Sequence, residues 1–363
     1  MNAPSPLDLA LALVAERVGL DPKSLDKRVA RVDVHQRRGV TLELSPVVGS
    51  KPDPRRWFRV REETLSELHP ECDRELPLSS TLDAAEACLS WRPGRRIVVS
   101  HVDPALLQKG YRTDKDKGPL LAHQLFHAAS ADAKLLRTPQ VRPGAEGLSA
   151  LVLSRVEGQP VRVVSEAGDF FCALGEGLAD TQRRLIDAPL PAHRVHDELG
   201  VLESWQHKAH LACGHLPPMW SDLSQALAEA SDSVEVDSLV GIHRDLHDGQ
   251  LLDADGSPGL IDFDLGCRGD ACLDPANLLA HLELRLLQRF PGVTRSSVDT
   301  CSEAFLEGLG DLQGNAWPRL RFYQSSAFLR LALVYSIRPR WRHLANPLVT
   351  FAQRCLADLV HAS

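Results

Sequence analysis

The sequence predicts an α+β protein with two lobes, a small antiparallel β-sheet followed by a larger helical region. Short alternating apolar segments flank a Pro93-Gly94 turn between residues 86 and 111, which is the pattern of a β-hairpin. After residue 166 most apolar residues recur at helical spacing. Residues 241–264 lie between the predicted helices and do not follow this spacing. This segment is rich in His, Asp and Gly.

The first lobe is predicted at residues 81–157. Strands are expected at residues 86–91, 95–102 and 105–111, because apolar residues alternate there and Pro-Gly favours the tight turn between the first two. A helix is expected over residues 119–136, and a further strand over residues 150–156.

The second lobe is predicted at residues 158–363. Apolar spacing predicts its helices at 166–185, 196–211, 222–230, 277–290, 298–309, 317–337 and 347–361. Residues 1–80 are Pro-rich and charged, and form an N-terminal extension to which we assign no role. Within this extension an amphipathic helix is expected at residues 7–18 and a strand at residues 40–48.

Composition limits the classes of partner. With 363 residues, 44% hydrophobic and 25% charged, the chain is long enough for two lobes with substantial cores. Its net charge of -7 argues against nucleic acid as a partner, because proteins that bind a phosphate backbone concentrate positive charge. No run of eighteen apolar residues occurs, so we expect no membrane partner. Nothing in the sequence indicates an oligomeric state.

The cysteines indicate a reducing compartment. Eight are scattered along the chain without a C-x-x-C pair or metal-ligand spacing, and we expect them to be thiols. Residues 7–18 are interrupted by charges and lack a preceding basic segment, which does not fit a signal peptide. We therefore predict a cytoplasmic protein.

The most informative segment is Gly241-Ile242-His243-Arg244-Asp245-Leu246-His247-Asp248-Gly249-Gln250, followed eleven residues later by Ile261-Asp262-Phe263-Asp264. Its first part matches the kinase signature H-R-D-L-x-x-x-N, with Gln250 in the asparagine position. Phosphoryl transfer requires a carboxylate that accepts the proton of the attacking hydroxyl, and oxygen ligands that hold magnesium against the nucleotide phosphates. We assign the first role to Asp245 and the metal to Gln250 and Asp262. Asp264 is either a further metal ligand or a loop anchor.

Together with Gly269-Asp270 and Asp274-Pro275-Ala276-Asn277-Leu278, these motifs resemble the aminoglycoside phosphotransferase family, which includes choline-type and sugar kinases. Members carry an H-x-D loop, an I-D-F pair and a G-D-P-x-x-D-L segment; here Ala271 replaces the proline. The resemblance implies a protein-kinase-like bilobal fold, ATP with GTP as the alternative, Mg²⁺, and a small hydroxyl-bearing acceptor. It also implies that Asp274 braces the catalytic loop, whereas its position before a proline fits a helix N-cap.

The resemblance places the nucleotide on the first lobe. Lys109, on the third predicted strand, takes the position of the phosphate-contacting lysine, and Arg155 and Glu157 lie in the linker that would meet the nucleotide base. Two features depart from kinases: the helix at 119–136 contains no glutamate to hold the lysine, and Gly94 is the only glycine of the first turn. His123 or Gln124 could brace the lysine, and Arg95 and Arg96 could supply the missing charge.

Only nine residues separate Asp264 from Asp274, which leaves no room for the activation segment and A-P-E motif that hold a peptide substrate. A small-molecule acceptor is therefore favoured, of the aminoglycoside, sugar or amino-alcohol type. For a cationic acceptor, acidic pocket residues are available in Asp197, Glu198, Glu203, Glu283 and Glu303.

Two alternatives remain open. The first is a weak or inactive nucleotide-binding pseudokinase, because of Gln250 and the missing glutamate. The second is a metallohydrolase, in which His243, Asp245 and His247 would share one face of a strand.

Overall fold

The computed structural model of the protein describes residues 4–45, 55–82, 88–133, 135–234, 236, 238–310 and 316–362. Its contacts divide the chain into two compact units. Unit 1 comprises Met1–His69, Asp197–Ser231 and Ser325–Ala357, and unit 2 comprises Pro70–His196, Asp232–Gln324 and Asp358–Ser363. Unit 1 thus joins the N-terminal extension with helices from the second predicted lobe, while unit 2 holds the predicted sheet and all of the motifs.

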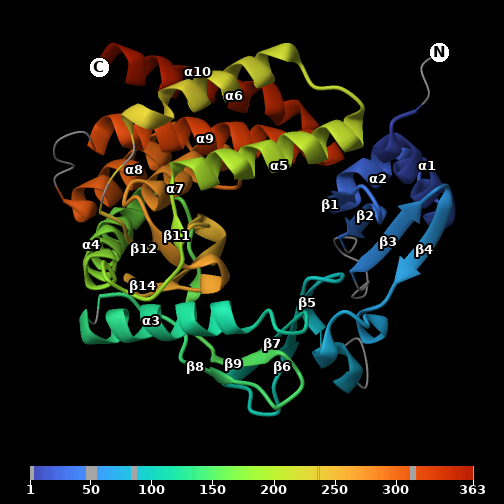
Figure 1. Ribbon diagram of the computed structural model, residues 1–363, viewed down its shortest axis with the longest axis horizontal. Coiled ribbons are helices and arrows are strands. Elements are labelled where there is room, and N and C mark those ends of the chain that lie inside the picture. Colours follow the sequence, from blue (N-terminus) through green and yellow to red (C-terminus); the bar gives the residue numbers. More distant parts are fainter. Residues whose placement is uncertain are drawn as a thin grey trace. The chain divides into compact units, whose positions relative to one another are not determined.

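Unit 1 is built on an antiparallel meander, coloured blue in Figure 1: β1 (Val29–His35), β2 (Gly39–Leu44), β3 (Arg56–Arg61) and β4 (Thr64–Leu68). Helix α1 (Pro6–Val18) contacts β2, β3 and β4 and precedes α2 (Pro22–Arg28). Ser5 caps α1 by accepting a hydrogen bond from Asp8, and Gly19 ends it at φ 67°, a left-handed conformation that glycine adopts without strain. Leu7, Leu42 and Phe58 are fully buried in this unit.

The rest of unit 1 is helical. It contains most of α5 (Val195–Cys213), α6 (Pro218–Ala230), the second half of α9 (Ala316–Ser336), η8 (Pro339–Leu344) and most of α10 (Ala345–Ala362). The helix predicted at 7–18 is confirmed. The strand predicted at 40–48 is β2, which ends at Leu44, and its last three residues lie outside the described part of the chain. The sequence did not predict β1, β3 and β4.

Unit 2 begins with η1 (Pro70–Cys72) and η2 (Pro77–Thr81), followed by a five-stranded antiparallel sheet in the order β5-β6-β7-β9-β8. Its strands are β5 (Cys88–Arg92), β6 (Arg96–Ser100), β7 (Leu106–Tyr111), β8 (Val141–Pro143) and β9 (Ala150–Ser154). The predicted strands are confirmed, except that residues 86 and 87 lie outside the described residues. Helix α3 (Lys117–Ala133) connects β7 to β8 (Figure 1).

The register of β6 and β7 determines which side chains can reach the motif segment. Arg96 pairs with Tyr111 and Val98 with Lys109. Because side chains alternate between the faces of a strand, Lys109 and Tyr111 share a face, and Arg96 opposite Tyr111 lies on it as well.

The helical part of unit 2 is formed mainly by α4 (Gly168–Arg184), α7 (Leu273–Leu287) and α8 (Arg295–Leu309). Helices α4 and α8 approach closely at glycines: a Cβ on Gly175 would lie only 2.3 Å from the Phe305 carbonyl oxygen, so a larger residue does not fit there. Two small sheets lie beside these helices. The first has the strand order β10-β13-β14, with β10 (Gln159–Pro160), β13 (Leu251–Ala254) and β14 (Ser257–Leu260). The second has the strand order β11-β15-β12, with β11 (Ala192–His193), β15 (Cys267–Gly269) and β12 (Val240–Ile242).

These elements confirm the predicted fold class, an antiparallel sheet joined to a larger helical region. All seven helices predicted after residue 158 are found, and their ends differ from the predicted ones by at most four residues. In the described part of the chain no helix combines the length and the apolar character needed to span a bilayer.

Candidate active site

The catalytic loop leaves β12 at Ile242 and is held by its first residue. His243 is fully buried. Its Nε2 lies 3.0 Å from the carbonyl oxygen of Ile261, and its Nδ1 accepts a hydrogen bond from the backbone N–H of Asp245 at 3.3 Å. Residues 243–247 are not a strand, so the basis of the metallohydrolase hypothesis is wrong. Both nitrogens of His243 therefore contact backbone groups, one within the loop and one at Ile261.

Asp274 braces this loop. Its two carboxylate oxygens accept hydrogen bonds from the backbone N–H groups of His243 at 2.6 Å and Arg244 at 2.7 Å. Arg244 has φ 70°, which costs energy in a residue other than glycine and is stabilised here by these bonds. Burial raises the pKa of Asp274, and this effect exceeds the opposite influence of His243 and the two N–H groups. The N-cap interpretation is wrong, because α7 begins at Leu273 and its N-cap is Cys272.

A β-hairpin brings the two motif segments together. β13 and β14 pair from Leu251 opposite Leu260, and the Ile261 N–H donates to the Gln250 carbonyl oxygen at 3.2 Å. Gln250 is 5% exposed, and its Nε2 donates to Oδ2 of Asp245 at 3.4 Å. Its Oε1 is buried and has no hydrogen-bond partner within the described residues. The predicted residues Asp245, Gln250 and Asp262 therefore lie at one end of the hairpin.

Asp262 and Asp264 form a charge cluster with the sheet residues on the shared face. Lys109 Nζ lies 2.5 Å from Oδ1 of Asp262 and 2.6 Å from Oδ1 of Asp264. Arg96 Nη1 donates to both carboxylates, at 3.2 Å and 3.0 Å. The Tyr111 hydroxyl donates to Asp264 at 2.8 Å. Two cationic side chains thus neutralise two carboxylates in a site where the side chains of Asp262 and Asp264 are only 22% and 12% exposed.

Phe263 fixes the direction in which these carboxylates point. Its ring is buried and stacks on Phe126 of α3 at a centroid distance of 4.8 Å, and it contacts the rings of His123 and His243. Asp262 itself has φ 72°, a left-handed conformation. With Phe263 directed into the core, the side chains on either side of it turn towards the sheet.

The charges change how these groups titrate. Burial by itself raises the pKa of Asp264, but Lys109, His123 and Arg96 outweigh it and hold that pKa far below its usual range. Burial and the neighbouring Asp264 carboxylate also raise the pKa of Asp262, but Lys109 and Arg96 outweigh both and lower it. Burial and the Asp264 carboxylate raise the pKa of Tyr111 well above its ordinary value. At neutral pH the cluster therefore contains two carboxylates and a neutral phenol.

Two of the predicted departures from kinases can now be described. The ammonium group of Lys109 is held by Asp262 and Asp264, not by α3. His123 of α3 does point into the cluster, where its Nε2 lies 3.5 Å from Asp264 Oδ1. Of the two arginines at the first turn, Arg96 reaches the carboxylates and Arg95 is exposed.

The backbone of the turn between β5 and β6 is held by hydrogen bonds within the protein. Gly94 has φ 64°, and its N–H donates to Oδ2 of Asp73, which also accepts the indole N–H of Trp91 at 2.9 Å. The Arg95 N–H donates to the Arg92 carbonyl oxygen at 2.9 Å. These N–H groups are used within the protein, so they do not form a phosphate-binding loop.

Comparison with known proteins identifies the family of the chain. The sequence model of the phosphotransferase enzyme family (APH) matches residues 111–323, which are 213 of the 363 residues. The chain belongs to this phosphotransferase family. It is thus a phosphotransferase. No curated protein matches the sequence significantly.

Solved structures show the same fold. An amicoumacin kinase in complex with AMP-PNP, Ca²⁺ and Ami matches with TM-score 0.52 and 13% identity, over 77% of this chain and 89% of that chain. A choline/ethanolamine kinase family protein from Mesorhizobium loti matches with TM-score 0.50 and 14% identity, over 78% and 95%. A glucosamine kinase matches with TM-score 0.50 and 16% identity, over 96% and 99%. Since the unmatched 4% of 363 residues is about 15 residues, this last match includes most of residues 1–69.

The linker of this phosphotransferase is tied to the rest of unit 2. Arg155 and Glu157 are exposed. The Arg155 N–H donates to the Ala105 carbonyl oxygen at 2.8 Å and its Nε to the Pro104 carbonyl oxygen at 2.7 Å. The Glu157 carbonyl oxygen accepts a bond from Arg137 at 2.7 Å. These two residues therefore contribute to the linker's own structure, and the structure does not bring them to the charge cluster.

Sequence reasoning missed three residues that shape the site of this phosphotransferase: Asp73, Tyr111 and Arg137. Asp73 and Arg137 act through loop contacts that have no local pattern. Tyr111 could have been found, because it follows Lys109 by two positions on a strand and so shares its face.

Proposed function

We propose that the protein transfers the γ-phosphoryl group of ATP to a hydroxyl group of a small-molecule acceptor, with Mg²⁺ as the cofactor. The observation that carries the proposal is the charge cluster. Asp262 and Asp264, at the end of the hairpin that also bears Asp245 and Gln250, meet Lys109 from the facing sheet. A site for phosphoryl transfer needs this combination of acidic metal ligands and a phosphate-binding cation.

The residues present fit a magnesium ion. Carboxylate and amide oxygens are the ligands that Mg²⁺ prefers, and Gln250 Oε1 is a buried oxygen without a hydrogen-bond partner in the described residues. Asp262 and Asp264 supply negative charge next to it. When bound, the ion neutralises the phosphate oxygens and orients them for in-line transfer.

Lys109 and Arg96 take the complementary role. In the structure both neutralise the two carboxylates, which a dication would neutralise in their place. Released from these ion pairs, an ammonium and a guanidinium would remain on the sheet face, where they can donate to phosphate oxygens. Arg96 would thus supply part of the charge that a glycine-rich loop would otherwise provide through its backbone.

Asp245 accepts the proton of the acceptor hydroxyl in this proposal. Its carboxylate is partly exposed and receives a hydrogen bond from Gln250 at 3.4 Å, which orients it. The nucleotide base would lie against the linker after β9. There we assign the contact with the base to Val156. Its backbone N–H and C=O make no hydrogen bond to described residues, whereas Arg155 and Glu157 each use one such group. GTP is the alternative phosphoryl donor, because the backbone groups of the linker do not exclude its base.

For the acceptor we propose an aminoglycoside, a sugar or an amino alcohol. Nine residues link Asp264 to Asp274, of which Cys267–Gly269 form β15, so no platform for a peptide follows the metal site. The names of the solved neighbours, which include a glucosamine kinase and a choline/ethanolamine kinase family protein, suggest that amino sugars and amino alcohols belong at the head of an acceptor panel. We also propose that the protein acts in the cytoplasm, because none of its eight cysteines forms a disulfide.

The test is a screen that measures nucleotide consumption with ATP or GTP, Mg²⁺ and a panel of hydroxyl-bearing metabolites. Asp245→Asn is the matched control, because it keeps the size of the side chain and removes its capacity to accept a proton. We expect at least one acceptor whose phosphorylation falls roughly 100-fold or more in the variant.

The pseudokinase alternative predicts a different result. It requires nucleotide binding, measured by calorimetry, without turnover of any acceptor and without a difference between the wild type and Asp245→Asn. Magnesium-dependent turnover that is equally fast in both proteins would contradict the role of Asp245.

A further inference from the structure

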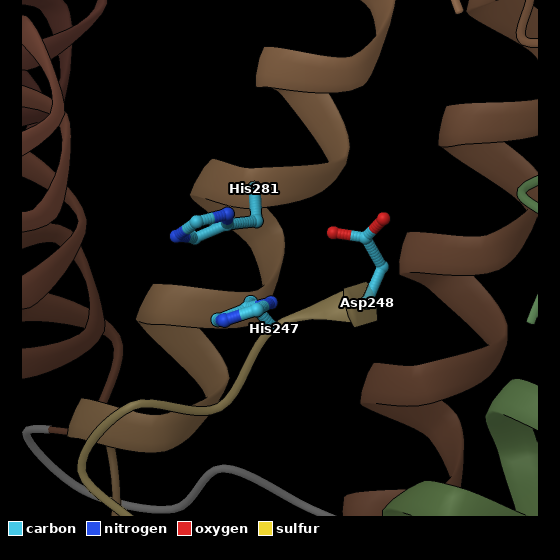
Figure 2. Close-up of side chains that lie close together, drawn as sticks. All are labelled: His247, Asp248 and His281. Atoms are coloured by element: carbon cyan, nitrogen blue, oxygen red, sulfur yellow. The ribbon is translucent and has the colours of Figure 1, made fainter. Parts of the chain in front are cut away.

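A second group of metal-ligating side chains lies beside the catalytic loop. His247 and Asp248 lie in the second half of the catalytic loop, before Gln250, and His281 lies on α7, seven residues after Asp274. One ligand atom from each of the three lies within 4.8 Å of the others. Figure 2 shows the two imidazole rings stacked, with the carboxylate of Asp248 beside them. The ring centroids are 4.8 Å apart and the planes differ by 20°.

Asp248 provides the observation that points to a ligand. Its Oδ2 accepts a bond from Arg285 Nε at 2.7 Å. Its Oδ1 is buried and has no hydrogen-bond partner in the described part of the chain. A buried carboxylate oxygen without a partner is costly, and a bound cation is one of the few explanations for it. In Figure 2 one oxygen of this carboxylate is directed towards the two histidines.

We propose that His247, Asp248 and His281 form a binding site for a transition-metal dication, distinct from the magnesium site of the proposed function. Two imidazoles and one carboxylate are the donor set of many zinc sites, whereas Mg²⁺ and Ca²⁺ prefer oxygen alone. Arg285 forms an ion pair with Asp248 and would hold this carboxylate in position for the metal, as residues behind metal ligands commonly do.

Binding requires two local adjustments. Ligands of a tetrahedral zinc ion are about 3.3 Å apart, so the three side chains must move inward from their present separation. Gly249 N–H donates to Nδ1 of His247 at 3.0 Å, and this nitrogen must carry the proton when Nε2 binds a metal. Gly249 is exposed, so its N–H can bind water in exchange. The Arg285 guanidinium also repels a dication, and we expect weaker binding than at a structural zinc site.

The site would join two elements of the catalytic machinery. His247 and Asp248 lead into Gln250 through η6 (Asp248–Gln250), and His281 belongs to the helix that carries Asp274. A metal held by both would fix the end of the catalytic loop to α7. It would therefore stabilise the protein in proportion to the free metal concentration.

The experiment is a titration of the full-length protein, without a histidine tag, nucleotide or acceptor. Co²⁺ binding is followed by its visible absorption, and Zn²⁺ binding by competition with a chromophoric chelator. We expect one equivalent to bind, and Zn²⁺ at a hundredfold excess over its dissociation constant to raise Tm by roughly 3 °C or more. Because protons compete for imidazole nitrogens, binding should weaken as the pH is lowered.

Two variants and a control locate the site. His281→Asn and Asp248→Asn should each weaken binding at least about tenfold. His207→Asn removes an exposed histidine of α5 and should leave binding unchanged. The proposal is overturned by the absence of saturable wild-type binding up to about 0.1 mM free metal, or by a folded His281→Asn that binds like the wild type. Neither readout involves turnover, so a failed kinase assay would leave this result unaffected.

Discussion

The catalytic loop and the charge cluster are adjacent in the active site, but they are held in different ways. The loop is fixed by hydrogen bonds to its backbone: Asp274 accepts two N–H groups, and the Asn277 amide donates to the Arg244 carbonyl oxygen at 3.1 Å. The cluster is held by ion pairs between side chains that are more than 150 positions apart in the sequence. Backbone hydrogen bonds inside a core have no replacement partner, whereas ion pairs at a partly exposed site can exchange one counter-ion for another.

This difference suggests a division of labour. We expect the loop to hold Asp245 in the same position with and without a ligand. The cluster is a neutral set of two carboxylates and two cations, in which a dication can replace the cations and phosphates can replace the carboxylates. Substitutions in the loop scaffold should therefore reduce stability first, and substitutions in the cluster should reduce ligand binding and catalysis first.

The largest effect is expected for Asp262→Asn. The variant keeps the size of the side chain but removes one of the two negative charges that would bind the metal. We expect magnesium-dependent turnover to fall roughly a thousandfold, which corresponds to about 4 kcal/mol of transition-state stabilisation. The measurement is kcat for nucleotide consumption over a range of Mg²⁺ concentrations. A variant with the wild-type rate and the wild-type magnesium requirement would show that Asp262 is not a metal ligand.

Asp274→Asn tests the opposite half of the comparison. Asparagine has one acceptor oxygen where aspartate has two, so one buried N–H of the His243–Arg244 pair loses its partner. We expect a loss of about 2–3 kcal/mol in the free energy of unfolding, measured by urea denaturation. Asp299→Asn is the control, because that side chain is 50% exposed and its ion pair with Arg295 should contribute less than about 1 kcal/mol. Equal midpoints for the two variants would contradict the scaffold role.

The sequence predicted the loop better than the cluster for a physical reason. Asp245 and Gln250 of the loop precede a hairpin whose two strands are joined by two residues, and Asp262 follows it, so the proximity of these three residues follows from local spacing. The pairing of Arg96 with Asp262 and Asp264 depends on how the sheet packs against the hairpin, which no local pattern contains. Lys109 was predicted only through a resemblance to kinases.

The same reasoning explains the strands that were missed. In β3 the adjacent residues Trp57 and Phe58 are both buried. Strands that are covered on both faces do not alternate between apolar and polar residues, so the period of two is lost. In β1 a register irregularity between Val29 and Arg31 interrupts the alternation further.

Arg96→Gln sharpens the comparison within the cluster. If Arg96 binds phosphate when the metal has replaced it at the carboxylates, its loss should weaken nucleotide binding about tenfold, or about 1.4 kcal/mol. Arg95→Gln is the matched control, because that neighbouring arginine is exposed. The nucleotide affinity of this variant should stay within about twofold of the wild-type value. Binding is measured by calorimetry with a non-hydrolysable nucleotide and Mg²⁺. Equal losses in both variants would indicate a general effect of charge and not a specific contact.

Tyr111→Phe should have the smallest effect, and its pH dependence is informative. The variant keeps the buried ring and removes one hydrogen bond to Asp264, which Lys109 and Arg96 still neutralise; we expect a loss of about 0.5–1 kcal/mol in unfolding free energy at neutral pH. The pKa of Tyr111 is raised in the folded protein, so its stabilising contribution is complete below the unfolded value of about 10 and decreases as the pH rises through the folded value. Unfolding curves of wild type and variant should therefore differ by a constant amount up to about pH 9 and converge in more alkaline solution. A difference that instead grew with pH would mean that the phenol is ionised in the folded protein. The carboxylates of the cluster would then not carry the negative charge on which the comparison with the catalytic loop depends.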